Sequence, residues 1–196
     1  MKIQLTKLSQ QRRQYHRESH LQITILNSQS SHSKQSELLA PVRVQLTRFA
    51  YSSLSLGTFG RVQLVLHRPT NTFYALKTMS IKRVIESKQV EHVRNEKNIL
   101  TRINHPFLVR LQCTTHTNAL LYLLLDYLPG GELFQMMRKS EKFDAKTAIF
   151  YASEVLLGLD YLHHMDILYR DLKPVNILLK MNVRLIVFLG KYFIRW

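Results

Sequence analysis

The hydrophobic and polar positions change period along the chain, and the first half reads as strands. Alternating and β-branched runs predict strands at residues 44–54, 62–66 and 73–79. The turn RPTNT at 68–72 would join the last two as a hairpin. Residues 82–100 predict a helix, and HPFLVRL (105–111) and NALLYLLLDYL (118–128) predict two more strands. The expected fold is an antiparallel sheet with one inserted helix.

After the Pro-Gly-Gly stretch at 129–131 the pattern becomes helical. A short helix is expected at 132–138 and a longer one at 145–164, where apolar residues recur at helical spacing. The longer helix is apolar on nearly all its faces, so we expect it to be buried on several sides. Together with the sheet, this predicts an α+β protein.

Residues 1–42 are rich in Ser, Gln, His and Arg, and we expect them to be largely disordered, with LQITIL as the only candidate strand. Pro41 marks the expected boundary. The 196-residue chain has a net charge of +15, but its basic residues are spread rather than clustered with aromatics, so no specific nucleic-acid binding is expected. The single cysteine, Cys113, sits in an apolar stretch and suits a small core residue in a cytosolic or nuclear protein. The apolar runs are too short to span a membrane, and no signal peptide is expected.

Three short motifs in the strand-rich half suit nucleotide binding. LSLGTFGRV (54–62) places Gly57 and Gly60 between two strands, where backbone N–H groups can approach an anion. In FYALK, Ala75 and Lys77 share one face of a strand. Glu96 lies on the inward face of the predicted helix and needs a cation, for which Lys77 is the candidate. Each motif has a plain structural alternative, namely a turn, a solvated lysine or a surface ion pair.

The most specific signal is LYRDLKPVNILL at residues 168–179. Asp171 can accept a proton from a hydroxyl, Lys173 can neutralise a phosphoryl oxygen, and Asn176 offers an oxygen to a divalent cation. Orienting a nucleophile, neutralising charge and holding a metal are the parts of phosphoryl transfer.

These motifs resemble the protein kinases, and in particular the catalytic subunit of cAMP-dependent protein kinase and its near relatives. The resemblance rests on GTFGRVQLV, YALKTM, NEKNIL, NHPFLVRL, YLPGGELF and LYRDLKPVNILL, and it spans about residues 46–186. It implies a β-rich small lobe at 43–128, the start of a helical large lobe with the catalytic loop at 129–186, and a divergent tail at 187–196. It also implies an ATP-dependent serine/threonine kinase activity with Mg²⁺.

The resemblance implies a role for each motif residue. Asp171 would be the catalytic base and Lys173 would touch the γ-phosphate, while Asn176 would hold Mg²⁺. The adenine would lie among Val62, Ala75 and Leu178, next to a gatekeeper at Leu125. The other nucleotide contacts would come from the phosphate loop, the hinge and two charged positions: Leu54, Gly57, Thr58, Phe59, Gly60, Lys77, Glu96, Asp126, Leu128 and Glu132. Glu132 would also meet a basic residue of a Ser/Thr substrate, and a regulatory subunit or a chaperone is an expected partner.

The chain departs from the family pattern at several positions. Ser55 stands where the first loop glycine belongs, and Val175 replaces a glutamate that in relatives helps to read substrate arginines. The metal-binding aspartate of Asp-Phe-Gly falls on Val187 when aligned on Phe188, or on Leu189 when counted from Asn176 without a gap. Neither side chain binds metal. Three interpretations remain: an active kinase by ancestry, a catalytically impaired module that binds nucleotide or a partner, and a truncated product with little function of its own.

Overall fold

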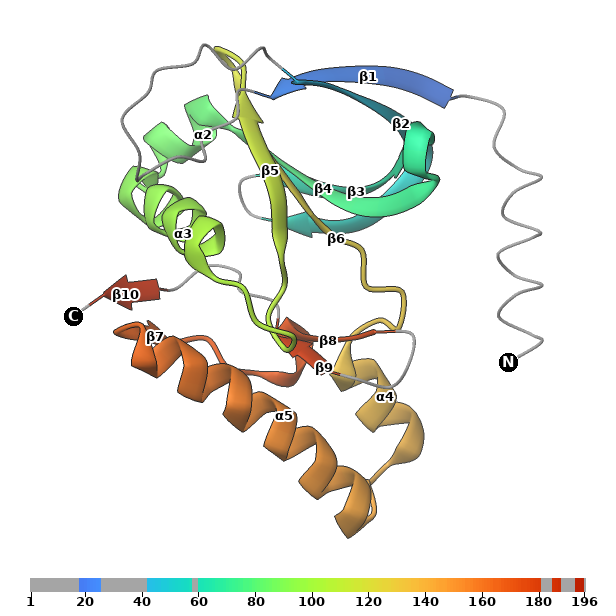
Figure 1. Ribbon diagram of the computed structural model, residues 1–196, viewed down its shortest axis with the longest axis vertical. Coiled ribbons are helices and arrows are strands. Elements are labelled where there is room, and N and C mark those ends of the chain that lie inside the picture. Colours follow the sequence, from blue (N-terminus) through green and yellow to red (C-terminus); the bar gives the residue numbers. More distant parts are fainter. Residues whose placement is uncertain (1–17, 26–41, 58–59, 181–184, 188–192, 196) are drawn as a thin grey trace. The chain divides into compact units, whose positions relative to one another are not determined.

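The computed structural model describes residues 18–25, 42–57, 60–180, 185–187 and 193–195, and Figure 1 labels its elements. The chain divides into two compact units. The first, the sheet unit, comprises residues 1–79 and 113–124, and the second, the helical unit, comprises 80–112 and 125–196. The predicted lobe boundary at 128/129 stays a prediction, since the helices after residue 80 group with the helical unit.

A six-stranded sheet runs in the order β1-β2-β3-β4-β6-β5. Antiparallel ladders join β1 to β2, β2 to β3, and β3 to β4. The hairpin predicted at 68–72 is confirmed, since a short 3₁₀ turn (Arg68–Thr70) connects β3 to β4. The strands are β1 (Glu18–Ile25), β2 (Val42–Gly57), β3 (Gly60–His67), β4 (Thr72–Ser80), β5 (Leu111–His116) and β6 (Leu120–Asp126).

The one strand expected in the N-terminal segment, LQITIL, is confirmed for residues 21–25, which lie in β1 and pair with β2; the rest of 1–41 lies outside the described residues. Two other expectations about this half were wrong in detail. The predicted helix 82–100 is two helices, α2 (Ile81–Glu86) and α3 (Val90–Arg102), interrupted where Lys88 takes a φ of 56°. The predicted strand at 105–111 is a turn, in which the Leu108 N–H donates to the His105 carbonyl oxygen at 3.1 Å. Pro106 lacks an N–H for a ladder, so the strand begins only at Leu111.

The sheet unit has a small apolar core. Val65, Leu76 and Leu124 form its buried centre, and Cys113 packs against them with two tyrosines. Burial raises the pKa of the Cys113 thiol to about 11, so the thiol stays protonated at neutral pH. The interpretation of Cys113 as a small core residue is confirmed.

The helical unit is built on α4 (Leu133–Ser140) and α5 (Ala145–His164), as the sequence predicts. Asp144 caps α5 by accepting a 2.8 Å hydrogen bond from the Thr147 N–H, which lowers the pKa of its carboxyl. Two antiparallel two-stranded sheets follow, in which β8 (Ile177–Leu179) pairs with β9 (Leu185–Val187), and β7 (Ile167–Tyr169) pairs with β10 (Phe193–Arg195). A 3₁₀ turn, Pro174–Asn176, leads into β8.

The core of this unit lies where α4, α5 and β8 meet. Its buried residues are Leu133, Tyr151, Ile177 and Leu179. The expectation that α5 is buried on several sides was wrong for the described residues, because Ile149 and Leu156 are each 66 % exposed. No helix among the described residues is long and apolar enough to cross a membrane.

Candidate functional site

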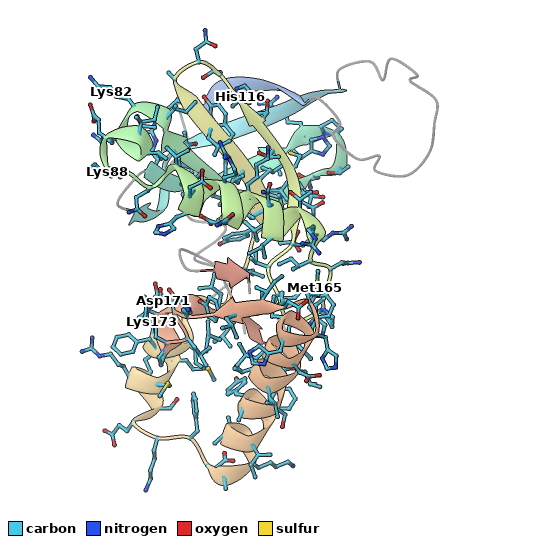
Figure 2. The ribbon with its side chains drawn as sticks, turned by 90° about the vertical axis from the view of Figure 1, so that its left-hand side faces the viewer. Lys82, Lys88, His116, Met165, Asp171 and Lys173 are labelled. Atoms are coloured by element: carbon cyan, nitrogen blue, oxygen red, sulfur yellow. The ribbon has the colours of Figure 1, made fainter. Side chains whose placement is uncertain are left out.

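The predicted catalytic loop forms a closed polar cluster within the helical unit. The Lys173 Nζ lies 2.8 Å from Oδ1 of Asp171. The Asn176 Nδ2 donates 2.8 Å hydrogen bonds to the main-chain oxygen and to Oδ2 of Asp171. Both carboxylate oxygens of Asp171 are therefore held, and Figure 2 labels Asp171 and Lys173 at this loop. The structure brings together the three residues that the sequence singled out here.

Tyr169 supports this cluster and was missed by sequence reasoning. It is 8 % exposed, and its side chain is hydrogen-bonded to that of Asn176. Burial, and then the charge of Asp171, raise the pKa of its phenol, so the group stays neutral. Only its place two residues before Asp171, at the end of an apolar strand, could have pointed to it. Tyr169 helps to fix the Asn176 amide against the loop.

The Pro-Gly-Gly stretch explains how Glu132 reaches this loop. The Gly130 N–H donates to the Leu179 carbonyl at 2.9 Å, and the Leu179 N–H donates to the Gly131 carbonyl at the same distance. A Cβ on Gly130 would lie 2.4 Å from the Leu179 oxygen, and Gly131 has a φ of 76°, so both positions favour glycine. The backbone of Glu132 consequently forms an isolated antiparallel β-bridge with Leu178, the predicted adenine contact.

In the sheet unit, the register of β3 and β4 gathers the predicted adenine and phosphate residues on one face. Val62 pairs with Lys77, and Leu64 pairs with Ala75. Directly opposite residues of an antiparallel pair point to the same side, so these four side chains share a face. Ala75 does not lie directly opposite Val62; it pairs with Leu64, two residues further along β3. Sharing a face was correctly predicted, and the roles of these residues stay a prediction.

The phosphate-loop residues are described only in part. Gly57 pairs with Gly60 at the β2–β3 turn, and Ser55 pairs with Val62 beside a register shift. Thr58 and Phe59 lie outside the described residues, and Leu54 is described only as part of β2. A Cβ on Gly60 would lie 1.7 Å from the Thr78 oxygen, so the β4 backbone alone accounts for this glycine.

Glu96 and the hinge lie in the helical unit. Glu96 is 5 % exposed on α3, which confirms its predicted inward face, whereas its pairing with Lys77 joins two units and stays a prediction. The Asp126 N–H donates to the Arg110 carbonyl at 3.1 Å, and its Oδ1 accepts a 2.6 Å hydrogen bond from Gln112. That N–H is committed within the protein, so a purine would have to use other hinge groups. The flanking Leu125 and Leu128 are buried.

The donor set around the loop does not fit Mg²⁺. This ion favours octahedral oxygen coordination that includes carboxylates. Asn176 supplies one neutral oxygen, and Asp171 is already paired with Lys173. The described residues contain no group of three or more His, Cys, Asp or Glu side chains that could hold a metal. The side chains of Val187 and Leu189, where the resemblance requires an aspartate, have no metal-binding atoms.

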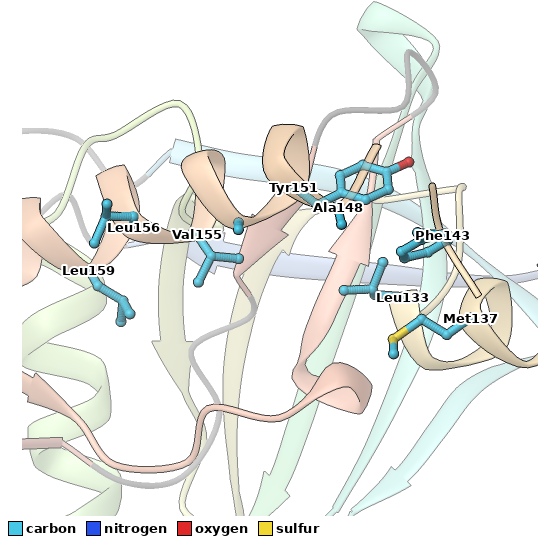
Figure 3. A pocket seen from close by; sticks show the side chains of 9 residues that line it. Leu133, Met137, Phe143, Ala148, Tyr151, Val155, Leu156 and Leu159 are labelled. Atoms are coloured by element: carbon cyan, nitrogen blue, oxygen red, sulfur yellow. The ribbon is translucent and has the colours of Figure 1, made fainter. Parts of the chain in front are cut away.

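A separate apolar groove of about 410 Å³ lies between α4 and α5 (Figure 3). The Tyr151 hydroxyl donates to the sulfur of Met136 at 3.6 Å, so this ring is held within the unit. The groove has no charged lining residue and carries no part of the predicted chemistry. Its lining consists of Leu133, Met137, Phe143, Ala148, Tyr151, Ala152, Val155, Leu156 and Leu159.

The antiparallel sheet, the helical unit and the Asp171–Asn176 loop are those of a protein kinase domain, and the sequence profile of the protein kinase domain matches residues 50–188. This chain belongs to the protein kinase family.

Similar proteins refine the comparison. The human putative serine/threonine-protein kinase PRKY is 49 % identical over 130 residues, which cover 66 % of this chain and 47 % of that protein. The human cAMP-dependent protein kinase catalytic subunit PRKX is 49 % identical over 128 residues, covering 65 % and 36 %. A cAMP-dependent protein kinase catalytic subunit of the fungus Arthrobotrys oligospora is 42 % identical over 171 residues, covering 82 % and 33 %. The chain thus spans between a third and a half of the length of these relatives.

Proposed function

We propose that this chain is a nucleotide-binding domain of the serine/threonine kinase type, with weak transfer of the γ-phosphoryl group from ATP to a Ser or Thr hydroxyl. The observation that supports it most is the Asp171–Lys173–Asn176 cluster, with both carboxylate oxygens of Asp171 held at 2.8 Å. A carboxylate fixed in this way is preorganised to accept a hydroxyl proton, and a lysine beside it can neutralise charge on a phosphoryl oxygen.

The family pattern assigns Val62, Ala75 and Lys77, which share one face of the β3–β4 pair, to the nucleotide. It also assigns to the nucleotide Glu96, the hinge from Asp126 to Leu128, Glu132 and Leu178. Gly57, Gly60, Leu54, Thr58 and Phe59 would form the loop over the phosphates. These roles follow the family pattern residue by residue.

The transfer step is expected to be slow. Phosphoryl transfer depends on positioning and on neutralising charge, and this chain lacks the carboxylate that the family uses for its metal. Loss of one preorganised electrostatic element typically costs about 3–4 kcal/mol of transition-state stabilisation, a factor of roughly 10²–10³ in rate. An impaired module that only binds nucleotide or a partner is therefore the second candidate.

Nucleotide binding is tested first, with a fluorescent ATP analogue titrated into the wild-type chain and into Lys77→Ala. We expect weaker binding by the variant, because it loses the cation on the shared face. Arg61→Ala is the matched control, since Arg61 is exposed and lies one residue from Val62, on the opposite face of β3. Equal affinities for all three proteins, or no binding at all, would reject the proposal.

Transfer is tested with radiolabelled ATP, Mg²⁺ and an arginine-rich serine peptide, in the wild type and in Asp171→Ala. The proposed substrate class, a Ser or Thr near basic residues, rests on Glu132 alone because Val175 replaces the second acidic position. Slow incorporation that disappears in Asp171→Ala supports the kinase assignment, and none in either protein favours the impaired module. A regulatory subunit or chaperone as partner, and a cytosolic or nuclear location, are proposals of the same standing.

A further inference from the structure

We propose that the catalytic loop of this chain binds the phosphates of ATP directly through Lys173, as a metal-free polyphosphate, so that nucleotide binding does not depend on Mg²⁺. The inference rests on the proposed nucleotide-binding function and concerns the form of the nucleotide that the site selects.

The first argument is the lack of free carboxylates for a metal. Residues 172–196 contain no Asp or Glu. The one carboxylate of the loop, Asp171, is neutralised in place by the Lys173 ammonium at 2.8 Å and by the Asn176 amide. A hard dication brought here would meet a lysine and a single neutral amide oxygen. The lysine is paired with Asp171 and offers no ligand atom, and a single amide oxygen holds a hard dication poorly.

The second argument is the charge that remains. Residues 170–180 carry three basic side chains, Arg170, Lys173 and Lys180, against the single carboxylate of Asp171. Arg170, Lys173 and Lys180 are all exposed. ATP without a metal carries more negative charge than its Mg²⁺ complex, so a loop with excess positive charge favours the metal-free form.

The third argument is the position of Lys173. Its side chain is 49 % exposed. Its ammonium group has three N–H donors, and one of them is directed at the Asp171 carboxylate. It can therefore keep its bond to Asp171 and still donate to a phosphate oxygen. The Asp171 contact fixes the lysine at the loop, so its charge is held in place before the nucleotide arrives.

The experiment measures the dissociation constant of a ribose-labelled fluorescent ATP for the full chain, in excess EDTA and in excess Mg²⁺. We expect equal or tighter binding in EDTA. Lys173→Met should weaken binding in EDTA by about tenfold, the loss of one fixed charge near the phosphates. Lys82→Met is the matched control. It removes the same charge from an 84 % exposed side chain on α2, and we expect no change.

The outcomes separate this inference from the proposed function. Binding that is reproducibly weaker in EDTA than in Mg²⁺ would overturn the inference and leave nucleotide binding intact. No binding in either buffer would instead contradict the proposed function. A Lys173→Met variant that binds like wild type in EDTA would also overturn the inference, provided that its thermal unfolding matches that of the wild type.

A gain of metal dependence tests the cause. Leu189→Asp and Val187→Asp each restore a carboxylate at one of the two positions that the family alignment allows. We expect Mg²⁺ to strengthen nucleotide binding, relative to EDTA, in at least one of the two variants. If Mg²⁺ strengthens binding in neither variant, the missing carboxylate is not the reason for metal independence, and the inferred cause is wrong.

Discussion

The two sides of the helical unit differ in how completely their groups are satisfied. At the loop of residues 171–176, Asp171, Lys173 and Asn176 are held by an ion pair and hydrogen bonds, and Tyr169 is hydrogen-bonded to Asn176. Between α4 and α5, apolar side chains line an open groove, and Leu156 and Ile149 stand mostly in water. A hydrogen-bonded polar cluster of this kind is specified by a few residues close in sequence. An exposed apolar face is buried only when another surface packs on it. The loop can thus be well formed beside a surface that is not.

The largest predicted difference comes from shortening one leucine side chain to alanine on the buried face of α5 and one on its exposed face. Leu162 is fully buried and Leu156 is 66 % exposed, on the same helix. Leu162→Ala should lower the free energy of unfolding by about 2–5 kcal/mol, because it leaves a cavity in the core. Leu156→Ala should change it by less than about 0.5 kcal/mol. Urea denaturation followed by circular dichroism gives both values. A large loss for Leu156→Ala would show that α5 is covered on this side in solution.

The second prediction concerns the glycines that position the loop. Gly130→Ala should destabilise the chain by about 1–3 kcal/mol or more, since its Cβ would lie 2.4 Å from the backbone oxygen of Leu179. Gly158→Ala is the matched control, because its Cβ would lie 3.3 Å from the end of the Leu108 side chain and 3.7 Å from Phe107, and alanine favours a helix. Gly158→Ala should be neutral or stabilising in thermal unfolding. Equal melting temperatures for the two variants would mean that the contacts between Gly130 and β8 do not hold Glu132 beside Leu178.

The sequence predicted what depends on local pattern. The bounds of α5 and the β3–β4 hairpin follow from periodicity and turn residues, and the Asp171, Lys173 and Asn176 cluster follows from a motif whose spacing fixes its geometry. The failures came where tertiary contacts decide. The HPFLVRL run is apolar because Leu108 and Val109 are buried, 3 % and 1 % exposed, and an apolar run alone cannot distinguish a buried turn from a strand.

The strand register and the residues that hold the loop in place could not be predicted from the sequence either. The pairing of Val62 with Lys77 depends on the register between β3 and β4. No local signal in the sequence determines which residue of β4 lies opposite a given residue of β3. Tyr169 acts through Asn176, seven residues later, across a turn that must already be folded. The need for glycine at Gly130 arises from β8, which lies almost fifty residues further along the chain.

The turn before β5, which packs on α5, combines features of the polar loop and of the apolar groove. His105 stacks on Tyr161 with ring centroids 4.8 Å apart, and the Asn104 N–H donates to the Tyr161 hydroxyl at 3.1 Å. The His105 Nδ1 accepts a 3.3 Å hydrogen bond from the Phe107 N–H, which requires that nitrogen to be unprotonated. Burial lowers the pKa of His105 below its usual 6.5. The turn therefore holds the neutral ring.

The smallest predicted effect follows from that neutral ring. The pKa of His105 is lower in the folded state than in the unfolded state, so the unfolded chain binds more protons as the pH falls. The stabilisation is complete above pH 6.5 and is lost as the pH drops from there through the lowered folded pKa. The loss should stay under about 1 kcal/mol, the scale of one hydrogen bond. His105→Phe keeps a ring to stack on Tyr161 but cannot be protonated, so its unfolding free energy should fall less between pH 7 and pH 5 than that of the wild type. The eight other histidines are present in both proteins, so the difference between the two pH profiles is the measurement. Parallel profiles would show that the turn tolerates a charged His105, and that its contact with α5 depends on the Tyr161 hydroxyl and on packing alone.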